Sequence, residues 1–329
     1  MKKNIALVTG GFSGEAVISY RTATTIAANL DPSVYNVFKI DITADGWFYE
    51  TESGQRTVVD KNDFSLIADG KKILFDAVFI AMHGTPGEDG KLQGYFDTLR
   101  IPYTSCDAAS SAITFNKRYA VAVAKMAGIA VAKSVHLFSH SPLTAAEVAA
   151  SLSFPVFVKP NNGGSSIGMS KVDREQELQA AIDKAFAEDN QVLVEEMVQG
   201  REFTVGVFKS KGEITVLPLT EVRAHADKAF FDFEAKYQGR SDETTPAVVS
   251  EDIAEKIREA ARKIYEVFNL RGVVRIDFIY EEGSGSPFML EINTIPGQSA
   301  ASIVPQQVQS LGWSLKDFYT KLVEEALVS

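Results

Sequence analysis

The sequence predicts an α/β protein, because short apolar runs alternate with helical stretches and a glycine-rich turn follows the first of these runs. Strands are expected at 4–9, 35–40 and 77–82, and helices at 16–30 and 92–99. The turn Gly10-Gly11-Phe12-Ser13-Gly14 joins the first strand to the first helix. This order is typical of a parallel sheet with crossover helices, so residues 1–106 are expected to form a Rossmann-like domain.

The middle of the chain, 107–197, is predicted to form a smaller α+β domain. A largely helical stretch at 116–152 contains one strand at 134–138. A strand that begins at Val156, a helix at 175–188 and a strand at 192–196 complete this domain.

The remaining part, 198–329, is predicted to form a third domain, again α+β. Strands are expected at 202–208 and 214–217. The polar stretch 223–250 shows no clean periodicity, so it is expected to be a lid loop. One helical face is marked by Ile253, Ile257, Ala261, Ile264 and Phe268, and two apolar strands and two helices follow.

Composition and charge restrict the classes of partner. Among 329 residues, 45% are hydrophobic and 23% charged, which is typical of a globular protein, and the formal net charge of −10 argues against an extended nucleic-acid surface. No run reaches the roughly 18 apolar residues of a membrane span. The first apolar run stops at Val8, too short for a signal peptide, so a cytoplasmic location is expected. The single cysteine, Cys106, permits no internal disulfide.

A lysine followed by a glycine-rich loop is the first candidate site. In VFVKPNNGGSSIGMSKV, Lys159 ends an apolar strand, and Pro160 cannot extend a central ladder. Gly163 and Gly168 have the spacing of a P-loop, but Met169 stands where that motif needs lysine. Glycines and serines expose backbone N–H groups that can bind an anion such as phosphate. The alternative is a solvated hairpin turn with a surface lysine.

The glycine-rich turn after the first strand does not indicate dinucleotide binding. Its glycines do not follow G-x-G-x-x-G, and Glu15 would repel a pyrophosphate. A cationic group is therefore expected to face Glu15.

Two strands near the C-terminus are predicted to build an oxygen-ligand site. In GVVRIDFIY the alternation separates the apolar Val274, Ile276 and Phe278 from Arg275 and Asp277. In FMLEINTIPG it is expected to bury Leu290 and Ile292 and to expose Glu291 and Asn293 on one face.

Side-by-side pairing of these strands would bring together Asp277, Glu291 and Asn293. Oxygen ligands without His or Cys select a hard cation such as Mg²⁺. Arg275 on the same face can stabilise charge on a transferring phosphoryl group. The alternative is an exposed sheet face with salt bridges.

Several isolated residues have both a functional and an ordinary explanation. Glu195 ends a strand and could bind ribose hydroxyls or be solvated, and Met197 and Val198 could offer backbone hydrogen bonds to an adenine. Lys117 begins a helix and is equally consistent with a surface lysine. His83 follows a strand beside Gly84 and is as often structural as functional.

Considered together, these motifs resemble one family. The motifs are Glu15, HGTPGEDGKLQG from His83, NK at Lys117, VKPNNGGSSIGMSKV, EEMVQGREFTV, EAKY at Lys236, RIDF and EINTIPG. They resemble, in order from about residue 4 to residue 327, the D-alanine-D-alanine ligases of the ATP-grasp superfamily. The resemblance implies an ATP-grasp fold with ATP held between the second and third domains, and two D-alanines entering from the first.

The resemblance also implies an activity: ATP-dependent ligation through a D-alanyl phosphate for peptidoglycan precursor synthesis, in a homodimer. Two Mg²⁺ or Mn²⁺ ions are expected on Asp277, Glu291 and Asn293. The residues implied for ATP are Lys117, Phe157, Lys159, Ser166, Glu195, Met197, Val198, Glu202, Phe230, Lys236 and Leu290.

For the D-alanines, Glu15 is implied to bind the first ammonium and His83 to lie near the first carboxylate. Ser302 and the Ile303 N–H are implied to receive the second carboxylate. Arg275 and the Gly297 N–H are implied at the oxyanion, and Tyr237 and Ser165 in a chain that ends at Glu15.

The sequence departs from the family pattern at several positions. Gln298 and Ser299 replace the usual Met-Thr, Ala301 replaces a residue that is commonly polar, and Phe231 replaces a lid tyrosine. Ala16 and Val17 stand where charged residues are common. D-lactate or D-serine as acceptor remains an alternative, as does a non-catalytic ATP-binding protein, although such a protein would not need Arg275 beside three metal ligands.

Overall fold

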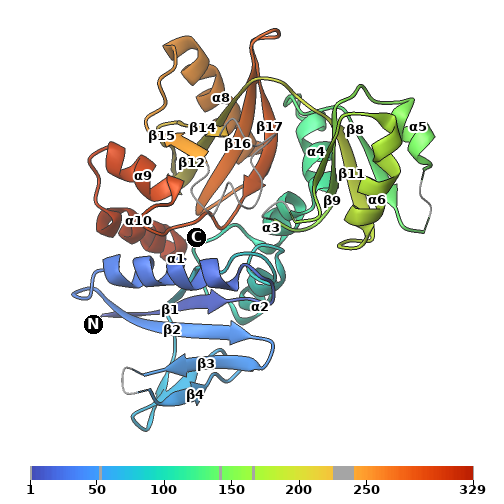
Figure 1. The fold of residues 1–329 in the computed structure, drawn as a ribbon. Coiled ribbons are helices and arrows are strands. Elements are labelled where there is room, and N and C mark those ends of the chain that lie inside the picture. The colour runs from blue at the N-terminus through green and yellow to red at the C-terminus, as the bar shows by residue number, and fades with distance from the viewer. Residues whose placement is uncertain (1, 52–53, 141–142, 165–166, 225–240, 329) are drawn as a thin grey trace.

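The computed structural model describes residues 2–51, 54–140, 143–164, 167–224 and 241–328. Its chain is arranged around three main sheets, which we call the first, second and third sheets in chain order. The first lies below the other two in Figure 1, and the second and third stand side by side above it.

The first sheet has the strand order β4-β3-β2-β1-β7. Its strands are β1 (Lys3–Gly10), β2 (Tyr35–Thr43), β3 (Gly46–Glu50), β4 (Arg56–Val58) and β7 (Ala77–Ile80), and its helices are α1 (Ala16–Asn29) and α2 (Lys91–Leu99). β1 pairs in parallel with β2 and β7, as expected for crossover helices. The sheet is nevertheless mixed, because β3 and β4 add antiparallel edge strands that the apolar pattern did not indicate. A separate hairpin joins β5 (Leu66–Ala68) to β6 (Lys71–Ile73).

The second sheet is antiparallel, with the order β10-β9-β11-β8. Its elements are β8 (Ser134–Phe138), α5 (Ala145–Ala149), β9 (Val156–Pro160), β10 (Ser170–Val172), the 3₁₀ turn η1 (Glu175–Glu177), α6 (Leu178–Phe186) and β11 (Gln191–Glu196), preceded by α3 (Ala108–Phe115) and α4 (Lys117–Met126). The expectation that Pro160 lies beyond the strand was wrong, because Pro160 pairs with Val192. It is tolerated there because β10 reaches only as far as Val158 on the other side.

The third sheet has the order β15-β14-β12-β16-β17, and β13 also pairs with β12. Its strands are β12 (Arg201–Ser210), β13 (Glu213–Val216), β14 (Thr220–Ala224), β15 (Ser241–Thr244), β16 (Val273–Glu281) and β17 (Ser286–Asn293). The predicted loop 223–250 was wrong in two places, because 223–224 belong to β14 and 241–244 form β15, and these strands pair antiparallel. Edge strands made of polar residues lack the apolar alternation that predicts a strand.

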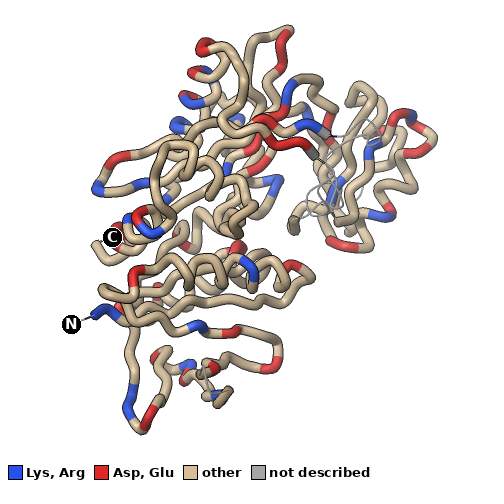
Figure 2. The backbone as a smooth tube through the Cα atoms, turned by 60° about the vertical axis from the view of Figure 1, so that its left-hand side comes forward, with Lys and Arg blue, Asp and Glu red and all other residues tan. Residues whose placement is uncertain are grey.

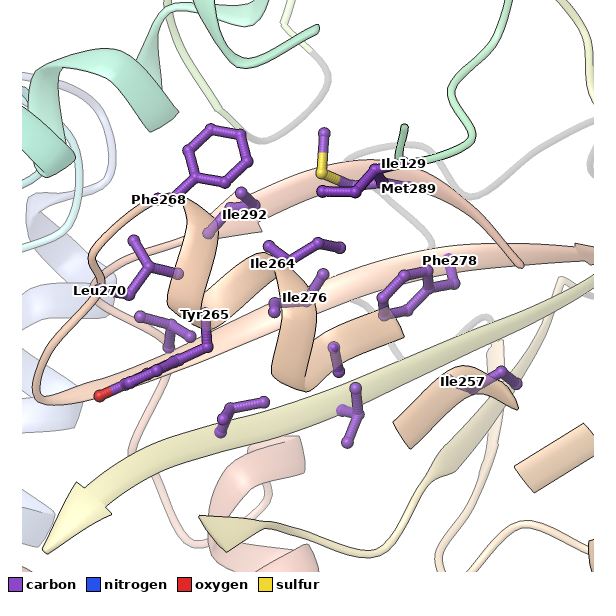
Figure 3. Packing of buried hydrophobic residues seen from close by; sticks show 14 of the residues in the cluster. Ile129, Ile257, Ile264, Tyr265, Phe268, Leu270, Ile276, Phe278, Met289 and Ile292 are labelled. Atoms are coloured by element: carbon purple, nitrogen blue, oxygen red, sulfur yellow. The ribbon is translucent and has the colours of Figure 1, made fainter. Parts of the chain in front are cut away.

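One face of the third sheet is covered by α8 (Glu251–Val267), as the apolar spacing predicted. Ile257, Ala261 and Ile264 are completely buried against the inward side chains of β12, β16 and β17. Figure 3 shows Ile264 and Ile276 facing one another in this core, with Met289 and Ile292 above them. Burial of this face leaves the opposite face of β16 and β17 for polar side chains.

The other two helices, α9 (Ile303–Ser310) and α10 (Leu315–Val328), connect the third sheet to the first. Phe318 and Tyr319 of α10 share a buried cluster with Ile5 and Leu7 of β1. These helices lie above α1 in Figure 1. Two parts of the chain that are distant in sequence therefore pack as one core.

No helix among the described residues is long and apolar enough to cross a membrane. Basic positions are interspersed with acidic ones in all three parts of the molecule (Figure 2).

Directly before β16, the backbone at Gly272 passes close to the backbone at Thr104, in the segment that follows the first sheet. Gly272 has a φ of +64°, and a Cβ placed on it would lie 2.0 Å from the Thr104 carbonyl oxygen. In the same region Cys106 Sγ donates to the Arg271 carbonyl oxygen at 3.1 Å. This contact sets where β16 starts relative to the residues that follow β7.

Gly272→Ala should therefore cost far more stability than a substitution at a similar glycine in open space. Gly212 has a φ of +81° and no atom within 4 Å of its ideal Cβ, so Gly212→Ala should cost about 1 kcal/mol, from backbone strain alone. Gly272→Ala adds a clash with backbone and should cost at least about 3 kcal/mol. Urea denaturation measures both, and equal losses would contradict the close-approach argument.

Candidate active site

Two adjoining cavities occupy the space between the three sheets. The first cavity, about 300 Å³, is lined from the first sheet's side by Glu15 and His83 and from the third by Arg275. The second cavity, about 630 Å³, lies between the second and third sheets. Asp277 and Glu291 line both. A ligand in one cavity can thus approach a ligand in the other at these carboxylates.

The predicted oxygen-ligand residues do come together at this junction. Antiparallel pairing sets Asp277 opposite Glu291 and Arg275 opposite Asn293. The Arg275 guanidinium donates to both carboxylate oxygens of Asp277 at 2.8 Å, and the Asn293 amide donates to Asp277 at 3.3 Å and to Glu291 at 3.5 Å. Thr204, which the sequence interpretation missed, also donates to Asp277. It faces Asp277 across the β12–β16 pairing.

The chemistry of this donor set fits a hard cation. Two carboxylates and one amide oxygen can be offered from two rigid strands, and no cluster of three or more His, Cys, Asp or Glu suited to a metal occurs within the described ranges. A cation here would therefore complete its shell with phosphate oxygens or water. The amide of Asn293 would have to rotate, because its NH₂ group now faces the carboxylates.

A β-bulge corrects the prediction for Leu290. The register shifts between Asp277 and Phe278, so Phe278 pairs with Met289 and Leu290 has no opposite partner. Met289 consequently enters the core, whereas Leu290 lines the second cavity. Burial of Leu290 in the core was wrong because strict alternation fails where one extra residue is inserted. Its placement beside the predicted nucleotide residues agrees with the role implied for it.

The second cavity gathers residues predicted for ATP. Lys159 and Glu195, both mostly buried, form an ion pair across neighbouring strands β9 and β11. Phe157 and Glu202 line the same cavity. Lys159 therefore already has Glu195 as its counter-ion, and it must leave or share that carboxylate to bind a phosphate.

The segment after β11 supports only part of the predicted adenine contact. Met197 and Val198 both line the second cavity. The Met197 N–H donates to the Pro155 carbonyl oxygen at 2.9 Å, so it is not free for a ligand. Within the described part of the chain, the Val198 N–H has no such partner. The Met197 carbonyl and the Val198 N–H are therefore the pair of groups that could meet an adenine edge.

The start of the glycine-rich loop is fixed by side-chain hydrogen bonds to neighbouring elements. Asn161 accepts from the Arg118 N–H at 2.8 Å through its side chain, while Asn162 donates to Asp189 through both its N–H and its amide. Lys117, at the start of α4, donates to the Gly163 carbonyl at 2.7 Å. These contacts hold Lys117 and the loop against each other. The two asparagines were missed because asparagine is common in turns and so does not by itself indicate a functional position.

Glu15 and Glu88 share the first cavity, and Glu88 was also missed although it belongs to the HGTPGEDG motif. Glu88 accepts from the Gly84 N–H at 2.7 Å and from the Ile295 N–H at 3.3 Å, so it connects the His83 loop to the segment after β17. Desolvation and the Glu15 carboxylate raise the pKa of Glu88 to about 8. The candidates for the cation expected to face Glu15 are Arg21, Lys117 and Arg275, which line the same cavity.

The segment after β17 carries the predicted groups for the second substrate. Gly297, Ser302 and Ile303 line the first cavity, and Ser302 is the N-cap of α9. A helix N-terminus presents unpaired N–H groups and a positive dipole end to an anion. Ser299, one of the departures from the family pattern, hydrogen-bonds the Ser302 hydroxyl at 2.7 Å. This departure therefore lies at the site predicted for the second substrate.

Six residues named from the sequence lie outside the described ranges. They are Ser165, Ser166, Phe230, Phe231, Lys236 and Tyr237. The chain from Tyr237 through Ser165 to Glu15 therefore stays a prediction. The lid also stays a prediction, because 225–240 lies outside the described ranges. Gly164, the last described residue before Ser165, lies close to Glu15: a Cβ placed on Gly164 would be 2.9 Å from a Glu15 carboxylate oxygen.

Comparison with known proteins identifies the family of this chain. Residues 4–106 match the family model described as D-ala D-ala ligase N-terminus, and residues 118–324 match the one described as D-ala D-ala ligase C-terminus. The chain belongs to the D-alanine–D-alanine ligase family. The resemblance seen in the motifs is thereby confirmed.

Individual members of the D-alanine–D-alanine ligase family are similar over the whole chain. A D-alanine--D-alanine ligase of Flavobacterium johnsoniae is 45% identical and covers 99% of both chains. The crystal structure of D-alanyl-alanine synthetase A from Vibrio cholerae has a TM-score of 0.89 at 29% identity and covers 100% of this chain and 99% of the other. VanG D-Ala:D-Ser ligase from Enterococcus faecalis has a TM-score of 0.87 at 32% identity and covers 98% and 99%. The predicted ATP-grasp fold is confirmed by these family structures.

Glu88→Gln should make the stability of the protein less dependent on pH. The folded state binds the Glu88 proton more tightly than the unfolded state, since the pKa rises from 4.5 to about 8. Stability from this group is complete below about pH 4.5 and is lost as pH rises through about 8. Urea denaturation between about pH 5 and about pH 8 should show the wild type losing more free energy of unfolding than the variant.

The matched control is Glu147→Gln on α5. Hydrogen bonds from Thr144 lower the pKa of Glu147, so this carboxylate stays ionised over the same pH range and its variant should keep the wild-type slope. Equal slopes in wild type and Glu88→Gln would show that Glu88 is not protonated near neutral pH.

Proposed function

We propose that this chain joins two D-alanines into D-alanyl-D-alanine, with ATP cleaved to ADP and phosphate, as a step in peptidoglycan precursor synthesis. The observation that carries the proposal is the junction of the two cavities at Asp277 and Glu291. The first cavity offers anionic and N–H groups suited to small zwitterions, and the second has the size and partly apolar lining that a nucleotide needs. The family supports the same conclusion.

The nucleotide occupies the second cavity in this proposal. The adenine lies against Phe157 and Leu290 and meets the Met197 carbonyl and the Val198 N–H. Glu195 binds the ribose hydroxyls, and Glu202 also contacts the nucleotide. Ser166, Phe230 and Lys236 complete the site as the family implies. Lys117 and Lys159 bind the phosphates, for which Lys159 releases Glu195.

The divalent cations, two Mg²⁺ or Mn²⁺ ions, are held by Asp277, Glu291 and Asn293. When bound, they neutralise charge on the transferring phosphoryl group. Arg275, which pairs with Asp277 and also lies 3.8 Å from Glu291, would then contact the transferred group, because bound cations would serve as counter-ions of these carboxylates.

The two D-alanines occupy the first cavity. Glu15 binds the ammonium of the first, and His83 lies near its carboxylate. The carboxylate of the second lies at the N-terminus of α9, against Ser302 and the Ile303 N–H.

The reaction has two displacement steps. A carboxylate oxygen of the first D-alanine attacks the γ-phosphorus of ATP, ADP leaves, and a D-alanyl phosphate forms. The amine of the second D-alanine then attacks the carbonyl carbon, loses a proton and expels phosphate. Arg275 and the Gly297 N–H stabilise the oxyanion between attack and expulsion. Ser165 and Tyr237 belong to the proton-handling chain that starts at Glu15.

D-serine is the second candidate acceptor. The Ser299 and Ser302 hydroxyls, 2.7 Å apart at the second substrate's site, could hydrogen-bond an added side-chain hydroxyl. D-alanine is favoured because the curated relatives at 40–45% identity are D-alanine--D-alanine ligases. A non-catalytic ATP-binding role is disfavoured by Arg275 beside three oxygen donors.

We further propose three domains, 1–106, 107–197 and 198–329, with a lid within 223–250. The enzyme is proposed to act in the cytoplasm as a homodimer, without nucleic-acid or membrane partners.

Glu291→Gln should lower Mg²⁺-dependent turnover at least about 100-fold, because a direct ligand should matter no less than the outer-shell groups whose loss costs 10–100-fold. Glu213→Gln, on exposed β13 of the same sheet, is the matched control and should retain full activity. The measurement is phosphate release with D-alanine across Mg²⁺ concentrations, together with urea stability. Near-normal turnover of Glu291→Gln at saturating Mg²⁺ would remove Glu291 from the metal site.

The acceptor test is product analysis with ATP, Mg²⁺ and mixtures of D-alanine with D-serine or D-lactate. D-alanyl-D-alanine should predominate, and L-alanine should give no phosphate release above background. A predominance of D-alanyl-D-serine would establish the second candidate. ATP binding without phosphate release under any of these mixtures would indicate the non-catalytic role.

A further inference from the structure

Two polar side chains lie on the buried face of α1, where the helical pattern would place apolar ones. Ser19 is completely buried and Thr22 is 1% exposed. Both contact His83: the Ser19 hydroxyl accepts from the His83 backbone N–H at 2.9 Å, and Thr22 Oγ1 lies 3.0 Å from Nε2 of the imidazole. Buried hydroxyls need partners, so this face of α1 is matched to one histidine.

The segment that follows β17 completes the contact. The backbone N–H of Gln298 donates to Thr22 Oγ1 at 3.3 Å. Gln298 is itself 3% exposed and is held by Tyr319 of α10, whose hydroxyl lies 3.3 Å from the Gln298 side-chain oxygen and 3.4 Å from its carbonyl oxygen. Gln298 is a position where the sequence departs from its family, and here it fixes the backbone next to Gly297.

The directions of these hydrogen bonds determine where the imidazole proton lies. A backbone N–H can only donate, so the Thr22 hydroxyl accepts from Gln298. Among the described residues Thr22 has no other hydrogen-bond acceptor than Nε2 of His83. The Thr22 oxygen could accept from Nε2–H as well as from Gln298, but its own buried hydrogen would then have no acceptor among the described residues. The arrangement that satisfies this hydrogen is donation to an unprotonated Nε2.

The imidazole is also neutral. Burial, with a smaller contribution from the Arg275 charge, lowers the pKa of His83 to about 4. A neutral imidazole that accepts at Nε2 carries its proton on Nδ1. Within the described part of the chain Nδ1 has no hydrogen-bond partner, and His83 lines the first cavity.

We propose that Thr22 and the Gln298 backbone N–H are positioning groups that fix His83 in the Nδ1–H tautomer, so that it presents a single N–H donor to an anionic oxygen of the first substrate. The inference rests on the proposed placement of the first D-alanine beside His83. His83 then serves as a hydrogen-bond donor and not as a base. Because Gln298 follows Gly297, the same contact links the first substrate's pocket to the oxyanion position.

The tautomer can be measured without substrate. Long-range hydrogen–nitrogen correlation spectra of full-length protein labelled with nitrogen-15 histidine distinguish the protonated from the unprotonated ring nitrogen. The chain has four histidines, and a His83→Ala variant assigns the His83 signals. In the wild type we expect Nδ1 protonated and Nε2 unprotonated near neutral pH, and the opposite tautomer or a charged ring would overturn the proposal.

Variants at Thr22 test whether the hydroxyl sets the tautomer. Thr22→Val keeps the shape but removes the donor to Nε2, so His83 should populate the Nε2–H form, and the KM for the first D-alanine should rise about 5- to 10-fold with the KM for ATP unchanged. Thr22→Ser should restore both readouts. Thr24→Val is the matched control, because among the described residues the Thr24 hydroxyl bonds only the Tyr20 carbonyl of its own helix.

An unchanged tautomer in Thr22→Val would overturn the role of Thr22. An unchanged tautomer together with an unchanged KM would overturn the whole inference. The placement of the substrate is tested separately by His83→Ala: if that variant leaves the KM for D-alanine unchanged, the first D-alanine does not contact His83, although the tautomer result in the wild type would stand.

Discussion

The antiparallel pairing of β16 with β17 is the constraint on which the site depends. One face of these strands is buried by α8, so Val274, Ile276 and Phe278 cannot turn outward without exposing the core. The opposite face must then carry Arg275 and Asp277, together with Glu291 and Asn293 from β17. A shift of the register by one residue would exchange the two faces, so the stability of the core and the geometry of the charged cluster are maintained by the same pairing.

The charged side chains in the site pair with one another. Arg275 pairs with Asp277, and Lys159 pairs with Glu195, in each case with little exposed side-chain surface. Desolvation offsets much of the Coulomb attraction in such pairs, so they hold the groups in place without requiring strong net binding. The nucleotide and cations proposed above would supply both signs of charge at once. Each protein group can therefore exchange partners without leaving a buried charge uncompensated.

The residues proposed to bind the first substrate are held in place by contacts between parts of the chain that are distant in sequence. The buried cluster of α10 and β1 and the close approach of Gly272 to Thr104 set the first sheet against the third. Glu88 reaches the Ile295 N–H across this boundary, and Gln298 reaches Thr22. The residues proposed to receive the first D-alanine are thus placed relative to the proposed oxyanion position by packing, and not by any one loop.

The sequence by itself determined the α/β class, the helix face of α8, the separation of Arg275 and Asp277 from the apolar side of β16, and the family. These features repeat with the period of one strand or helix, or lie in one continuous motif, so local order is enough to predict them. Only the tertiary structure decided that Leu290 leaves the core at a bulge, that polar β14 and β15 join the sheet, that Glu88 lines the first cavity and that Thr22 contacts His83. Each of these depends on a partner in another element, either in the neighbouring strand, as for Met289 opposite Phe278, or far along the chain, as for Gln298 and Thr22. Register and side-chain hydrogen bonds between distant segments are set by packing, which local sequence periodicity does not encode.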